Sequence, residues 1–182
     1  MATVVCLMKK TLGISILLVL VCIITAVINP NFLNPYNAEN LINWTSLFGV
    51  ISIGAAFVII TGGIDLSIGS VVGLVGTLLP YLLVKKHWGI PSAMMISLVV
   101  SVLIGWIHGQ LITRVKLQPF VVTLCGLLIY RGLARWMTQD DVQGFGNDYD
   151  GLRYLATGRI KLFFLGEYHL PVPLIILTVI AV

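Results

Sequence analysis

Long apolar runs alternate with short polar connections along the chain. A helix needs about 20 apolar residues, each rising about 1.5 Å, to cross the hydrocarbon of a membrane. A sixth apolar run, Leu170–Val182, follows five longer ones but would cover only about two-thirds of that thickness. The pattern predicts an all-α, polytopic transmembrane helical bundle of five full spans plus a truncated sixth, as in the front portion of a longer protein. The five predicted spans are Thr11–Ile28, Leu41–Ile60, Leu66–Val84, Ile90–Thr113 and Pro119–Met137.

Proline, asparagine and polar residues mark the connections between these spans. The string "NPNFLNPYNAEN" (29–40) carries Pro30, Pro35 and five asparagines, which predict a connection after the first span. Pro91 falls in the first turn of the fourth span, where proline is tolerated. Residues 138–169 are polar and predict an extracytoplasmic loop. We expect residues 1–182 to form a single transmembrane domain.

The start of the chain fits two interpretations. From Met8 the sequence has the basic start and apolar core of a signal peptide. No Ala-x-Ala cleavage site follows and the apolar run exceeds the usual length, so we expect a retained first helix, with translation from Met1 or Met8. Lys9 and Lys10 then predict a cytoplasmic amino terminus by the positive-inside rule.

Charges in the later connections leave the topology open. Counting crossings from a cytoplasmic amino terminus places Arg114–Lys116 inside, as the rule expects, but Lys85 and Lys86 outside. Either the orientation depends on the ends of the chain alone, or the break at Gly62–Asp65 is re-entrant rather than a full turn.

Composition excludes several classes of protein. The 182 residues are 58% hydrophobic and 10% charged, whereas soluble domains are about a quarter charged, so lipid must be the solvent. A β-barrel would need strands of about ten residues that alternate apolar and polar, which the unbroken apolar runs exclude. The net charge of +4 is scattered, without a basic patch interleaved with aromatics, and we expect no nucleic-acid partner.

Motifs of enzyme chemistry are absent from the sequence. It contains no G-x-x-x-x-G-K-[ST], H-E-x-x-H or G-x-S-x-G string. Its three histidines and three cysteines have neither metal nor disulfide spacing. The aspartates between residues 140 and 150 lack the ligand order of a calcium loop and indicate a solvated loop. We therefore expect no catalytic site, no metal site and no cofactor, and a chain that is not an enzyme.

The stretch "ITGGIDLSIGS" (60–70) interrupts the apolar pattern, and Asp65 is the sole acid within the five predicted spans. A tight turn, with Gly62 and Gly63 supplying unusual dihedrals and Asp65 or Ser67 capping the next helix, explains it. Alternatively the break lies within the hydrocarbon depth, where non-helical backbone survives only inside the protein or along a water-filled cavity. Interrupted helices of that kind build solute sites in transporters, and Asp65 there would cost about 3 kcal/mol unless paired or hydrated.

Three other polar side chains lie in the predicted spans. Arg131 and Arg135, four residues apart, either extend to the lipid headgroups or include a partner for Asp65 that would offset two desolvation costs. His108 lies near the end of its span, and we interpret it as a packing or interfacial histidine rather than a ligand.

Three strings carry a family resemblance: "PNFLNPYNAENLINWTS" (30–46), "AFVIITGGIDLSIGSVVGLVGTL" (56–78) and "KLQPFVVTLCGLLIYRGLA" (116–134). In this order they resemble the permease subunits of bacterial ABC sugar importers of the ribose and galactoside type, over nearly all of the chain. The resemblance implies a permease for a ribose- or galactose-like monosaccharide in the cell inner membrane. It also implies a second permease subunit (identical or a sister), two ABC ATPase subunits and a periplasmic sugar-binding protein as partners. Such permeases run to roughly twice this length.

Sugars are bound by a few polar groups in an otherwise apolar pocket. We expect the solute contacts at the break and at the starts of the second and fifth spans. The candidate residues are Asn43, Thr45, Gly62, Gly63, Asp65, Ser67, Gln118, Phe120 and Thr123. Two alternatives to an ABC permease stay open: a secondary transporter or channel that needs no ATPase, and a fragment that is not coupled to ATP.

Overall fold

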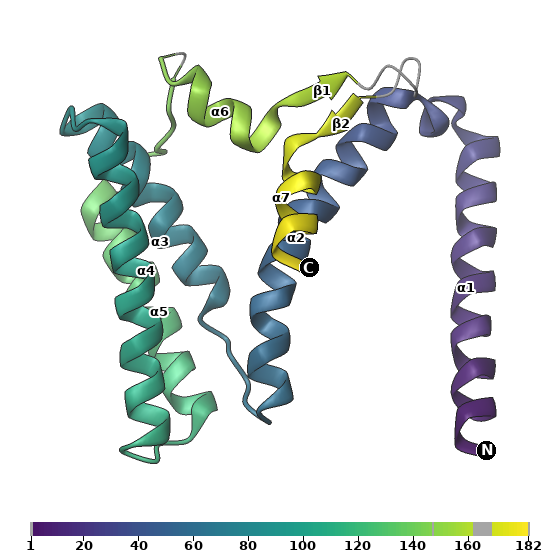
Figure 1. The fold of residues 1–182 in the computed structure, drawn as a ribbon, viewed down its shortest axis with the longest axis horizontal. Coiled ribbons are helices and arrows are strands. Elements are labelled where there is room, and N and C mark those ends of the chain that lie inside the picture. The colour runs from purple at the N-terminus through teal and green to yellow at the C-terminus, as the bar shows by residue number, and fades with distance from the viewer. Residues whose placement is uncertain (1, 147, 162–168, 182) are drawn as a thin grey trace. The chain divides into compact units, whose positions relative to one another are not determined.

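The computed structural model describes residues 2–146, 148–161 and 169–181. These residues form helices and one short strand pair (Figure 1). Contacts divide the chain into two compact units, Met1–Leu47 with Tyr154–Ile180, and Phe48–Arg153. The elements in chain order are α1 (Ala2–Ile28), η1 (Pro30–Leu33), α2 (Pro35–Ile60), α3 (Ile68–Pro80), η2 (Tyr81–Lys85), α4 (Ile90–Thr113), α5 (Pro119–Thr138), α6 (Asp150–Thr157), β1 (Arg159–Lys161), β2 (His169–Pro171) and α7 (Val172–Ala181).

The first unit contains the start of α2 and the strand pair. The side chain of Asn34 accepts a hydrogen bond from the backbone N–H of Tyr36 at 3.0 Å. Pro35 therefore opens α2 instead of breaking it, because a proline in the first helical position lacks only a donor that would be unpaired anyway. Strand β1 pairs antiparallel with β2, with Arg159 opposite Pro171.

The second unit contains the break and the helices around it. Helix α3 packs chiefly against α5 and also contacts α4, which contacts α5 in turn. After α2 ends, the chain turns at Thr61–Gly62 and then runs through residues 63–67 without regular structure before α3 begins. Figure 1 shows the chain reversing direction through this segment.

The end of α3 changes its helical winding. Pro80 lacks an N–H group, and the next turn, η2, is π-helical. Leu83 in this turn is fully buried, and its carbonyl accepts a hydrogen bond at 3.0 Å from the hydroxyl of Tyr149. Leu82, Leu83 and Ala93 form the buried core of this end of the unit. The segment after α5 thus closes over the end of α3.

Several predicted boundaries agree with the structure and others need correction. Helix α4 has the predicted bounds, and α5 ends one residue later than predicted. Helix α1 begins at Ala2 rather than Thr11, and α3 begins at Ile68 rather than Leu66 because a turn precedes it. The polar stretch predicted as a loop contains α6 and β1, so regular structure was missed there.

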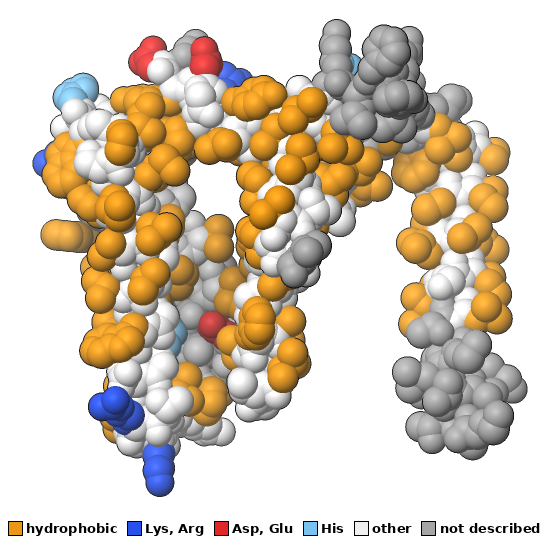
Figure 2. Space-filling view, viewed as in Figure 1, with side chains coloured by type: hydrophobic (Ala, Val, Ile, Leu, Met, Phe, Trp, Pro, Cys, Tyr) orange, Lys and Arg blue, Asp and Glu red, His pale blue; other side chains and the backbone are white. Residues whose placement is uncertain are grey.

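Four helices in the described part of the chain are long and apolar enough to cross a membrane. They are Pro35–Ile60, Ile68–Lys85, Ile90–Thr113 and Pro119–Thr138. Leu12–Ile28 and Val172–Ala181 are shorter apolar helices, so the predicted count of five spans plus a sixth stays a prediction. Large hydrophobic side chains cover the exposed helix surfaces, as Figure 2 shows. The chain is therefore a multi-pass helical membrane protein.

Two sequence predictions fall outside the described side chains. The side chains of Lys9 and Lys10, on which the predicted orientation depends, are not described, and neither is that of Cys6. Within the predicted loop 138–169, the structure describes residues 138–146, 148–161 and 169.

Candidate functional site

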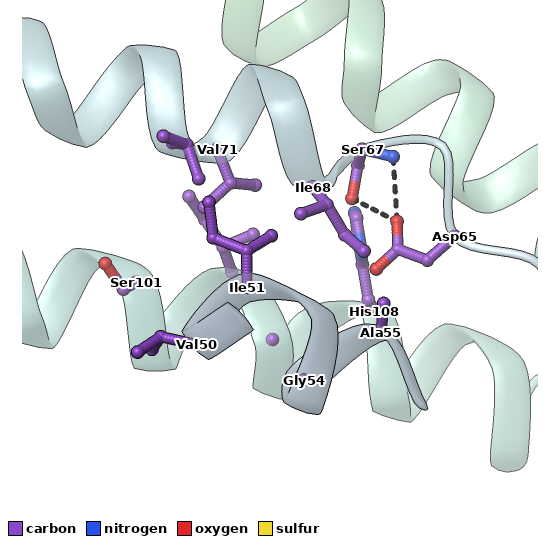
Figure 3. Close-up of a pocket in the computed structure, with 13 residues that line it drawn as sticks. Val50, Ile51, Gly54, Ala55, Asp65, Ser67, Ile68, Val71, Ser101 and His108 are labelled. Atoms are coloured by element: carbon purple, nitrogen blue, oxygen red, sulfur yellow. Dashed lines mark hydrogen bonds between the residues drawn. The ribbon is translucent and has the colours of Figure 1, made fainter. Parts of the chain in front are cut away.

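Asp65 organises the break between α2 and α3. Its Oδ1 accepts hydrogen bonds from the backbone N–H and from the hydroxyl of Ser67, each at 2.7 Å (Figure 3). This is the local turn that aspartate side chains make with the backbone two residues ahead. Ser67 is 2% exposed, and α3 starts directly after it. Ser67 is the N-cap residue and its side chain makes no capping hydrogen bond, so the predicted side-chain cap by Asp65 or Ser67 is not found, and Asp65 instead forms the turn before the helix.

Of the two alternatives for the arginines, pairing with Asp65 is not found in the described structure. Arg135 Nε instead binds Asp140 Oδ1 at 2.6 Å, and both side chains are about two-thirds exposed. Arg131 is exposed, and no ion pair joins it to Asp65 among the described residues.

Thr123 fastens the break to the start of α5. Its hydroxyl lies 2.9 Å from the carbonyl oxygen of Pro119, 3.3 Å from that of Phe120 and 3.2 Å from that of Ile64. The first two contacts stay within α5, but the third reaches the extended segment, and Thr123 is 2% exposed. Thr123 therefore lies beside the break, and its role as a solute contact stays a prediction.

The two glycines differ in what they contribute. Gly62 has φ +76°, a left-handed conformation that glycine adopts without cost, and a Cβ there would meet no atom within 4 Å. A Cβ on Gly63 would lie 3.1 Å from Cγ1 of Val58 and 3.9 Å from Cβ of Pro119. Gly62 thus allows the turn, and Gly63 allows the chain to pass close to α2.

Two pockets border the break within the second unit. One has a volume of about 330 Å³, and the other, on the side of the α5 start, about 490 Å³. Asp65, Gly105 and His108 line both pockets. Most of the remaining lining is apolar, with a few hydroxyl groups such as that of Ser101. This combination of apolar walls and few polar groups is typical of sites for small organic ligands.

Main-chain donors are also available at the break. In the described structure, no hydrogen bond uses the backbone N–H of Ile64, Asp65 or Leu66. Backbone groups away from water normally have partners, so unpaired donors beside a pocket favour contact with water or a polar solute.

His108 is the functional candidate that sequence reasoning missed. Its ring Nε2 lies 2.8 Å from the hydroxyl of Tyr130 on α5, and the residue is 9% exposed. The interpretation as a packing or interfacial residue did not anticipate that it lines both pockets with Asp65. The available signal was a single imidazole in an otherwise apolar helix, but its partner on α5 could not be read from spacing.

Four predicted site residues lie away from these two pockets. Asn43 and Thr45 belong to the first unit, where Thr45 is exposed. The side-chain oxygen of Asn43 is buried without a hydrogen-bond partner among the described residues. Gln118 precedes α5 and accepts the backbone N–H of Val121 and Val122 through its carbonyl, and its side chain is exposed. Phe120 is 44% exposed.

A second polar cluster lies in the first unit, around an acid that belongs to α2 because this helix begins at Pro35 rather than at the predicted Leu41. Glu39, on α2, is 3% exposed. Its Oε2 binds Arg159 Nη1 at 2.7 Å, and its Oε1 accepts from the backbone N–H of His169 at 2.7 Å and lies 3.0 Å from Nδ1 of that residue. Arg159 also donates to the side-chain oxygen of Asn40 at 3.1 Å. The cluster holds β1 and β2 against α2.

Comparison with known proteins identifies the family. Residues 37–182 match the family model described as branched-chain amino acid transport system / permease component. The chain belongs to this permease family. The matched residues include the break, both pockets and the Glu39 cluster.

Curated relatives of the permease come from several bacteria. The ribose import permease protein of Bacillus subtilis (strain 168) is 35% identical over 175 residues, which are 91% of this chain and 49% of that protein. The ribose import permease protein of Haemophilus influenzae is 31% identical, with the same two shares. The xylose transport system permease protein of Escherichia coli (strain K12) is 36% identical over 102 residues, 56% of this chain and 26% of that protein.

The chain thus spans about half the length of the ribose permeases that it matches. No solved structure matches it significantly.

Proposed function

We propose that this chain is the membrane-spanning permease subunit of an ABC importer that carries a monosaccharide across the inner membrane. Membership of the permease family supports this proposal, as do two relatives named as ribose import permeases that match 91% of the chain. The names of the relatives favour a ribose-like or xylose-like sugar.

One observation carries the proposed solute site: Asp65, in a non-helical segment, lines two pockets. A carboxylate and free backbone N–H groups offer acceptors and donors for sugar hydroxyls, and the apolar walls suit the C–H faces of the ring. Gly62, Gly63, Ser67 and Thr123 shape this segment. Asn43, Thr45, Gln118 and Phe120 remain predicted contacts outside the two pockets.

The energy for transport comes from partner subunits. The sequence has no phosphate-binding loop, so two ABC ATPase subunits bind and hydrolyse the ATP. A second permease subunit completes the path, and a periplasmic binding protein delivers the sugar. The path opens alternately to the two sides of the membrane, and the amino terminus faces the cytoplasm.

Sugar uptake in the native host tests the proposal. Deleting the gene should abolish ATP-dependent uptake of one labelled monosaccharide, and restoring this chain to the locus should return it. Uptake that continues after ATP depletion would favour a secondary transporter. Unchanged uptake of ribose, xylose and galactose after deletion would reject the proposal.

A further inference from the structure

His108 lies where the two pockets share their lining. It extends from α4 with its ring bonded to Tyr130, and it is the sole imidazole that lines either pocket. A buried imidazole needs hydrogen-bond partners on both ring nitrogens. Tyr130 binds Nε2 at 2.8 Å, whereas Nδ1 has no partner among the described residues. Figure 3 shows His108 among the labelled residues around the pocket, together with the Asp65–Ser67 turn.

Asp65, like His108, has a polar atom without a hydrogen-bond partner at the pockets. Its Oδ1 is engaged by Ser67, and its second carboxylate oxygen has no partner in the described structure. An ionised carboxylate can accept about four hydrogen bonds, so acceptor capacity is left over at the pocket. Asp65 and His108 therefore present unused polar atoms to the same two pockets.

Gly105 completes the shared lining. It lies one turn before His108 on α4, and a Cβ at this position would meet no atom within 4 Å. The space beside Gly105 is therefore open to both pockets. The smaller pocket also borders Val50 to Ala55 of α2, and the larger one borders Thr61 to Ile64 and the start of α5. A solute that moves from one pocket to the other passes these three residues.

We propose that Asp65, Gly105 and His108 form the selectivity point of the solute path. Sugar hydroxyls bind the free oxygen of Asp65 and the free ring nitrogen of His108 as the sugar passes beside Gly105. Tyr130 is a positioning residue that holds the imidazole in its orientation. The solute class is a neutral polyhydroxylated molecule, because one carboxylate and one imidazole among apolar walls supply hydrogen bonds without a cluster of like charges. This inference rests on the proposed transport function and adds His108 to the solute contacts.

Closing the space beside Gly105 tests the path. Gly105→Leu places an apolar side chain in the lining common to both pockets, and we expect uptake to fall to background at normal membrane abundance. Gly73→Leu is the matched control, since Gly73 on α3 also has open space around its Cβ position and lines neither pocket. Equal uptake by the two variants would overturn the proposed path.

Substrate analogues test the role of His108. Wild-type protein should transport a set of monodeoxy sugars less well than the parent, with the KM for one of them raised about tenfold by the loss of a hydrogen bond. His108→Ala should raise the KM for the parent sugar and lose discrimination against that one analogue, and Tyr130→Phe should weaken the same discrimination. A purely structural histidine would lower abundance and leave the order of preference unchanged, which would overturn the assignment.

The two proposals fail in different ways. If the wild-type chain transports no sugar, the proposed function fails. If it transports sugar and the Gly105→Leu and His108→Ala variants behave as the wild type does, the selectivity point alone fails.

Discussion

Gly126 offers a sharp test of the contact between α4 and α5. It is buried on α5 directly opposite the ring of His108. A Cβ there would lie 2.7 Å from Nε2 and 2.8 Å from Cε1 of His108, and 2.9 Å from Cε2 of Tyr130. Because the ring is buried and bonded to Tyr130, it cannot move aside without breaking that hydrogen bond. Gly126→Ala should therefore destabilise the protein.

The size of the effect follows from two costs and one gain. Overpacking of this kind costs about 1–3 kcal/mol, and a lost hydrogen bond costs about 1 kcal/mol. Replacing glycine by alanine in a helix returns roughly 0.5–1 kcal/mol. The net loss is about 2 kcal/mol, which for a chain of this size lowers the melting temperature by roughly 4–8 °C.

Thermal unfolding in a mild detergent measures this loss against a control on the same helix. Gly132→Ala is the control, since a Cβ at Gly132 would meet no atom within 4 Å, and its melting temperature should equal or exceed that of the wild type. The cost of Gly126→Ala should also shrink in a His108→Ala background, where the ring is gone. Equal melting temperatures for the two alanine variants would refute the packing argument.

Three further changes have expected outcomes. Thr123→Val should cost about 1 kcal/mol in thermal unfolding by releasing the break from α5, more than Thr77→Val, whose hydroxyl bonds only within its own helix. Glu39→Gln should cost about 2–3 kcal/mol in thermal unfolding and speed proteolysis near β1, because it removes the buried charge that pairs with Arg159. Asp140→Asn, in an exposed ion pair, should change neither measurably. Gly62→Ala should cost about 1 kcal/mol through its positive φ, and Gly62→Asn less; equal melting temperatures would contradict the turn geometry.

The apolar spans could be predicted because their signals are local. Pro91 in the first turn and the polar stretch after Thr113 determine the bounds of α4, and both are visible in the sequence. The same local reasoning failed at Pro35, which looks like a breaker but begins α2 once Asn34 caps the helix. Proline reports a boundary without saying on which side of it the helix lies.

The polar contacts could be predicted only where their partners are near in sequence. Asp65 and Ser67 are two residues apart, and the turn they form was anticipated. Glu39 finds its partners 120 and 130 residues later, and His108 meets Tyr130 across a helix interface. Periodicity says which face of a helix is apolar, but it does not say which other helix that face meets. The candidate site was therefore half visible: the acid was found and the imidazole was not.

The ion pair between Glu39 and Arg159 has a consequence for how the chain threads the bilayer. The two residues can meet only if the number of passages between them is even. Helices α2, α3 with η2, α4 and α5 supply four passages if each traverses the lipid once. If α2 and α3 shared a single interrupted passage, the number would be three, and the two side chains would face opposite aqueous compartments. The parity therefore excludes a single passage that is interrupted at Gly62 and requires the chain to reverse direction there. The 3.6 Å contact between Lys85 and Asp141, separated by α4 and α5, obeys the same rule.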